Sequence, residues 1–139
     1  LALPGIPGKR FLSLVGIEEE QVLVAPPIAG RDSLSFSELE RHWSGVGFLF
    51  WKDHLNLLPN LSEGAKGAHI EKLQGLLKEA GTYDKPMTGV YDKNTLLAVK
   101  EFQSSKGIEE DGIAGAQTLM VLYRSIDRFV VPRLTGGRK

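Results

Sequence analysis

The sequence contains no cysteine among its 139 residues. This absence excludes a disulfide framework, a thiolate metal site and a cysteine nucleophile within these residues. It does not identify the redox compartment, because an exported protein can also lack cysteine.

Long hydrophobic runs are missing as well. The longest, such as Val22–Ala25, are only a few residues, whereas a helix needs about 20 apolar residues to span a bilayer. No membrane-spanning helix is therefore predicted. The sequence starts at Leu1 without an initiator methionine or a signal-peptide pattern, so we expect an excised fragment whose targeting segment lies outside it.

The chain also lacks net charge, since 17 Lys and Arg residues balance 17 Asp and Glu residues. Without an overall basic field, binding of nucleic acid or of an anionic membrane by charge alone is not expected. The 42% hydrophobic and 24% charged residues are typical of a globular chain with one ordinary core or two very small ones.

Short strand-like segments separated by turn residues occupy the first part of the sequence. The strands are predicted at residues 1–3, 10–17, 21–25 and 45–51. Pro26 and Pro27 should end the third of these strands, because proline cannot donate to the ladder, and residues 30–33 should form a loop.

One short helix is predicted within this part. Ser35 or Ser37 can cap a helix that runs through Trp43, and Glu38 is placed as the capping-box partner of Ser35. Residues 1–54 are thus predicted to form a small antiparallel β-sheet segment with one helix.

From about His54 the pattern changes to three amphipathic helical blocks, with the boundary in the stretch 55–59. Gly81 and Gly107 follow the first two blocks and suit the left-handed position after a helix. The positions that follow a helical period in these blocks are Ile70, Leu73, Leu77 and Ala80, then Thr95, Ala98, Val99 and Phe102, then Leu119, Leu122, Tyr123 and Ile126. The shared apolar centre is expected around Ile70, Leu73, Leu77, Val99, Phe102, Leu119 and Leu122. An α+β fold is predicted, with a three-helix domain over 55–126 and a solvated basic tail over 127–139.

A short internal repeat lies inside the three-helix domain. Residues 88–96 and 111–119 both contain a turn residue, a glycine, an aliphatic residue, an amide, a threonine and a leucine in the same order. The glycine permits a positive φ, and the polar stretch leads into a helix N-terminus. Two equivalent loops are therefore predicted to enter two helices.

These residues resemble the three-helix peptidoglycan-binding domain of bacterial cell-wall proteins over residues 57–125. The resemblance is carried by Leu61–Gly67, Leu73-Gln74, Thr88–Asp92, Thr95, Ala98-Val99, Phe102-Gln103, Gly107-Ile108 and Asp111–Thr118. It implies non-catalytic binding of peptidoglycan.

In the first half, a strand that begins at Arg10 and a hairpin into residues 22–26 are followed by Gly30, residues 34–36 and a turn at residues 43–45. This order resembles the last strands of a papain-like peptidase domain of the bacteriocin-processing type. Where that family has a catalytic His this sequence has Lys9 or Arg10, and where it has an Asp before a proline this sequence has Ala25. Both catalytic positions are vacant, so no enzyme and no catalytic residue are predicted.

The order of these two segments resembles the periplasmic C-terminal region of the general secretion pathway protein A family. That resemblance implies a periplasmic fragment of an inner-membrane-anchored protein, which helps to place the type II secretion pore in the cell wall. Peptidoglycan and other secretion-pathway proteins are the implied partners. There are two alternatives. The chain could be a protein-interaction module that pairs with a secretion partner through residues 48–51 by edge addition, or it could be part of a cell-wall hydrolase.

Oxygen atoms of a peptidoglycan ligand can be bound by short polar side chains that lie beside helix N-termini. The candidates for peptidoglycan binding are Tyr91, Asp92, Asn94, Gln103, Asp111, Gln117 and Thr118. Tyr91 would add an aromatic face. The alternative for each is a structural role: Asp92 can cap its helix, Asp111 can order its turn, and Thr118 can satisfy backbone amides.

No metal or cofactor is predicted. His42, His54 and His69 are 12 and 15 positions apart, without a partner at i+3 or i+4 on a helix. Trp43 and Trp51 could form a platform for stacking on a sugar, but we expect both to be core anchors.

Overall fold

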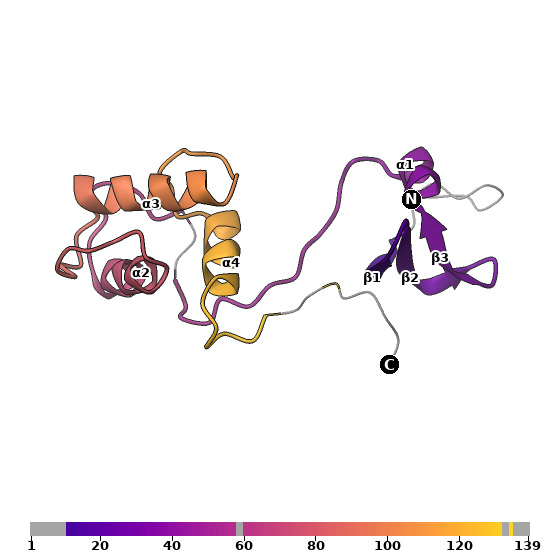
Figure 1. Ribbon diagram of the computed structural model, residues 1–139, viewed down its shortest axis with the longest axis horizontal. Coiled ribbons are helices and arrows are strands. Elements are labelled where there is room, and N and C mark those ends of the chain that lie inside the picture. Colours follow the sequence, from indigo (N-terminus) through magenta and orange to yellow (C-terminus); the bar gives the residue numbers. More distant parts are fainter. Residues whose placement is uncertain (1–10, 58–59, 132–133, 135–139) are drawn as a thin grey trace. The chain divides into compact units, whose positions relative to one another are not determined.

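The computed structural model describes residues 11–57, 60–131 and 134 (Figure 1). The chain divides into two compact units, of which the first includes the described residues up to Leu49 and the second is Phe50–Val131. The strand expected at 1–3 and most of the expected basic tail lie outside the described residues.

The first unit contains a three-stranded antiparallel sheet in the order β1-β2-β3, which confirms the expected small sheet. Its strands are β1 (Ser13–Glu18), β2 (Gln21–Ile28) and β3 (Arg31–Ser35). Ala29 and Gly30 join β2 to β3 with φ angles of 48° and 79°. Two consecutive positive φ angles match the right-handed twist of the strands in a two-residue hairpin turn.

Two details of the sheet differ from the sequence prediction. Strand β2 continues through Pro26 and Pro27, and residues 31–33 belong to β3, where a loop was expected. The pairing of β2 with β3 is irregular between Leu23 and Ile28. Prolines are tolerated at such an irregularity because no ladder hydrogen bond needs their missing N–H.

Helix α1 (Phe36–His42) has the predicted capping box. The Glu38 amide donates to Ser35 Oγ over 3.2 Å, and the Ser35 amide donates to Glu38 Oε2 over 2.9 Å. The small core of this unit consists of Val22, Val24 and Leu34, with Ile28 and Leu39 packed against it.

The strand predicted at 45–51 is wrong, because these residues form neither strand nor helix. Gly45 has a φ of 81°, and the side chains of Phe48 and Phe50 are 72% and 91% exposed. The Trp43 indole donates to the Val46 carbonyl over 2.9 Å and is half exposed. Trp43 therefore closes a local turn, and its expected core role is also wrong.

The second unit contains the three predicted helices, α2 (Ala68–Glu79), α3 (Lys93–Ser105) and α4 (Ala116–Arg124). The seven side chains expected at the shared centre are all fully buried: Ile70, Leu73, Leu77, Val99, Phe102, Leu119 and Leu122. Gly81 and Gly107 have φ angles of 86° and 65°. The left-handed helix ends predicted from these glycines are thereby confirmed.

The compact unit extends further in both directions than the expected 55–126. Trp51 packs against the core, as predicted for this tryptophan. Arg128 forms a two-pronged ion pair with Glu79, with both N···O distances at 2.8 Å, and the Phe129 ring lies 4.8 Å from that of Tyr123. The start of the expected solvated tail is therefore part of the helical unit. No helix among the residues described is long and apolar enough to cross a membrane.

Candidate functional site

The first repeated loop folds around the buried side chain of Gln74. Gln74 Oε1 accepts hydrogen bonds from the amides of Thr88 and Gly89 over 2.8 and 3.0 Å. Its Nε2 donates to the Val90 carbonyl over 3.0 Å and to Thr95 Oγ1 over 2.9 Å. One side-chain amide thus satisfies donors and acceptors of a loop that would otherwise be buried unpaired.

The second loop folds in the same way around Gln103. Gln103 Oε1 accepts from the Gly112 amide over 2.9 Å, and Nε2 donates to the Ile113 carbonyl over 3.1 Å and Thr118 Oγ1 over 3.0 Å. Gln103 is 1% exposed, so it is a structural residue and the expectation of a ligand contact is wrong. Its counterpart Gln74 was not among the predicted site residues. The signal in the sequence is that each glutamine directly follows a core residue, Leu73 or Phe102.

The glycine of each loop has the predicted positive φ, 65° at Gly89 and 71° at Gly112. A Cβ on Gly112 would lie 2.5 Å from Leu96 Cδ1 and 3.1 Å from Lys100 Cε. The backbone of the second loop therefore lies directly against α3, and only glycine permits this approach.

Backbone hydrogen bonds tie both loops to the segment 60–67. The Ala114 amide donates to the Leu61 carbonyl and the Tyr91 amide to the Ala65 carbonyl, each over 2.8 Å. The Gly67 amide donates to the Gly89 carbonyl, also over 2.8 Å. These bonds fix the position of each loop, and therefore the position of the side chains at the N-termini of α3 and α4, which follow the loops.

Tyr91 is fully buried, which contradicts the expectation that its ring faces a ligand. Its hydroxyl donates to the Gly112 carbonyl over 2.8 Å and so joins the first loop to the second. Burial, and then the negative charge of Asp111, raise the pKa of this hydroxyl above its ordinary value. Thr118 is also buried, 4% exposed, and its expected exposure to a ligand is wrong as well.

Four of the predicted site residues reach the surface: Asp92, Asn94, Asp111 and Gln117. Asp92 Oδ1 accepts from the Thr95 amide over 2.9 Å, and Asp111 Oδ1 accepts from the Ile113 amide over 2.8 Å. These backbone hydrogen bonds lower the pKa of both carboxyl groups, so both are ionised at neutral pH. The helix-capping and turn-forming roles of the two aspartates are thereby confirmed.

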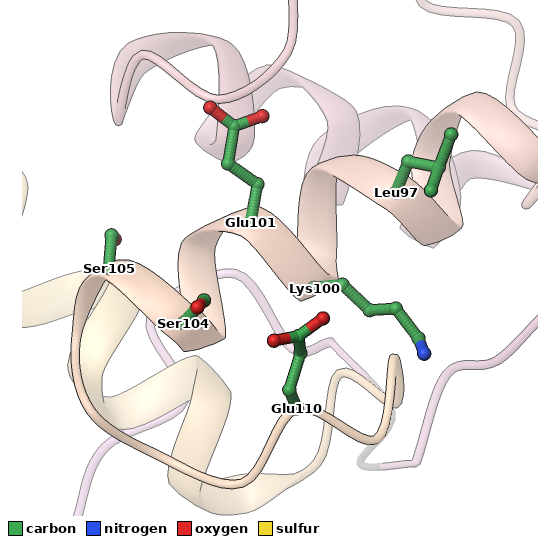
Figure 2. A pocket seen from close by; sticks show the side chains of 6 residues that line it. All are labelled: Leu97, Lys100, Glu101, Ser104, Ser105 and Glu110. Carbon is green, nitrogen blue, oxygen red and sulfur yellow. The ribbon is translucent and has the colours of Figure 1, made fainter.

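A shallow, open depression of about 520 Å³ lies beside the second loop (Figure 2). The lining residues, all polar or charged except Leu97, come from the outer side of α3 and the loop that follows: Leu97, Lys100, Glu101, Ser104, Ser105 and Glu110. Asn94 precedes Leu97 by three positions and therefore lies on the same face of α3. This depression could not be predicted from the sequence, because none of its lining residues belongs to a motif.

Within the described part of the chain, no group of three His, Cys, Asp or Glu residues could hold a metal ion. His54 instead packs with aromatic rings, its centroid 5.2 Å from Tyr123 and 5.0 Å from Phe129.

A family model described as a putative peptidoglycan-binding domain matches residues 66–122. The match begins just before α2 and ends within α4, so it includes both loops and their glutamines. The chain thus contains a peptidoglycan-binding type of domain.

The spore cortex-lytic enzyme of Halalkalibacterium halodurans is 34% identical over 82 residues, which are 57% of this chain and 25% of that enzyme. The chain thus spans about a quarter of the length of the curated relatives it matches.

Two solved structures are also similar. The N-terminal domain of SleB is 35% identical with a TM-score of 0.46, and the alignment covers 47% of this chain and 89% of that domain. A periplasmic domain of the EpsAB fusion protein of the Vibrio vulnificus type II secretion system is 26% identical with a TM-score of 0.46, covering 80% of this chain and 49% of that one.

Proposed function

We propose that this chain binds peptidoglycan without cleaving it and so attaches a larger protein to the cell wall. The family match over residues 66–122 carries this proposal. The geometry supports it, because the fixed loops present short polar side chains beside the N-termini of α3 and α4. Gly115 caps α4 without a side-chain hydrogen bond, so no side chain of the cap residue occupies the first amides of that helix.

The larger protein that we propose is an assembly factor of type II secretion, anchored in the inner membrane with this region in the periplasm. The proposal is supported by the resemblance in segment order, with the peptidase-like segment preceding the wall-binding domain. Ala25, at the position of the catalytic Asp in the resembling peptidases, supports a role without catalysis.

A second candidate is the binding part of a cell-wall hydrolase, since the curated relatives are spore cortex-lytic enzymes. In that case a catalytic part elsewhere in the protein would cut the wall that this domain holds. The third is a protein-interaction module, favoured by the exposed side chains of Phe48, Leu49 and Phe50.

Asn94→Ala combined with Gln117→Ala should keep the helical circular dichroism, because both side chains are exposed. We expect this double variant to lose most sedimentation with purified sacculi, since each lost hydrogen bond weakens binding by about 0.5–1.5 kcal/mol. Lys78→Ala, an exposed change at the end of α2, is the matched control. A folded double variant that sediments like the parent would place the binding surface elsewhere.

A further inference from the structure

We infer that the depression beside the second loop takes the peptide part of peptidoglycan, with a peptide carboxylate bound at Lys100. This inference rests on the proposed function and specifies which part of the wall is recognised there. The lining has charges of both signs, from Lys100, Glu101 and Glu110, together with serine hydroxyls. Figure 2 shows Lys100 and Glu110 next to each other, with Glu101 pointing away from them on α3.

The internal repeat shows that the depression is specific to the second loop. Aligning Gln74 with Gln103 in the sequence pairs Gly75 with Ser104 and Glu71 with Lys100. Aligning the loop glycines, Gly89 and Gly112, pairs Met87 with Glu110. In the first loop, Met87 Sδ lies 3.4 Å from where a Cβ on Gly75 would stand, so methionine fills the corresponding place. In the second loop, serine and glutamate occupy these positions, and the place is open.

Lys100 is positioned to present a cation. Its aliphatic stem packs against Gly112, since the Cβ of any larger residue there would come within 3.1 Å of Lys100 Cε and 3.3 Å of Cγ. None of the ion pairs within the described ranges involves Lys100 or Glu110. Figure 2 shows Lys100 extending from α3 and Glu110 rising from the following loop. The positive charge of Lys100 helps to lower the pKa of Asp111 without forming an ion pair with it, and the ammonium group can also bind a ligand carboxylate.

The lining also favours a peptide over a glycan. It contains no aromatic ring on which a sugar could stack. Ser105 Oγ donates to the Phe102 carbonyl over 2.8 Å, whereas Ser104 is exposed on the face that lines the depression. A stem peptide carries carboxylate, amine and amide groups, which match Lys100, the glutamates and Ser104.

The test is sedimentation of the full chain with sacculi in competition with two soluble probes, free stem peptides and peptide-free glycan strands. We expect stem peptides to displace the chain and glycan strands to leave it bound. Lys100→Met keeps the packed stem and removes the charge, and should weaken binding about tenfold through loss of one charge-assisted hydrogen bond. Glu110→Met places in the second loop the residue that fills the first, and should weaken binding similarly.

Lys78→Met is the control, because it removes the same charge outside the depression and should bind like the parent. Displacement by glycan strands and not by stem peptides would overturn the inference and leave the proposed function intact. Displacement by peptides with unchanged binding of both folded variants would overturn the assignment to this depression. If the parent chain does not sediment at all, the proposed function and the inference both fail.

Discussion

Phe102→Ala should lower the free energy of unfolding of the helical unit by about 3–5 kcal/mol, the usual cost of truncating a large core side chain. Phe102 is fully buried at the centre of the three helices. Truncation to alanine leaves a cavity in the apolar cluster that the three helices share, and such a cavity can collapse only in part. The measurement is the midpoint of urea unfolding, followed by helical circular dichroism.

Leu97→Ala is the matched control for this variant. Leu97 is on the same helix and is 54% exposed, so its truncation should change the stability by less than about 1 kcal/mol. An unchanged midpoint for Phe102→Ala would contradict the burial of this ring.

Gln103→Met should lower the free energy of unfolding by about 3 kcal/mol. Methionine fills a similar volume, but the Gly112 amide and the Thr118 hydroxyl lose a partner inside the domain. Each unsatisfied buried group costs about 1–3 kcal/mol. The second loop should also loosen, which amide hydrogen exchange at Gly112 would report.

Gln74→Met should lower the free energy of unfolding by a similar amount, because the Gln74 side chain makes the equivalent hydrogen bonds to the first loop. Gln117→Met, on the exposed side of α4, is the control and should leave the urea midpoint nearly unchanged. Equal midpoints for Gln103→Met and Gln117→Met would contradict the structural role of the buried glutamines.

The three helices and their core could be predicted because apolar residues with a helical period determine which face is buried. Ile70, Phe102 and Leu119 were assigned to the centre on this basis, and all are fully buried. The loop glycines were equally predictable, since a turn that needs a positive φ selects glycine.

Whether residues 45–51 form a strand could not be decided from these residues alone. Its apolar side chains are typical of a strand, but a strand exists only where another strand pairs with it. The described part of the sheet ends at β1 and β3, and Phe48 and Phe50 remain exposed. Apolar composition alone therefore led to the wrong prediction.

The candidate site was predicted in part. The helix and turn roles of Asp92 and Asp111 follow from local sequence, because their partners are two or three residues away. Tyr91 and Gln103 are different, since Tyr91 contacts the Gly112 carbonyl from 21 residues away and Gln103 lies inside the loop it supports. Only the tertiary structure shows that such polar side chains point inward.

The most direct test of peptidoglycan binding without cleavage is one incubation of the full chain with purified sacculi. Sedimentation should bring down the chain with the sacculi, and chromatography of the supernatant should show no released muropeptides. A chain that stays in the supernatant at every concentration tested would contradict binding. Muropeptide release that follows the purified chain would contradict the absence of catalysis.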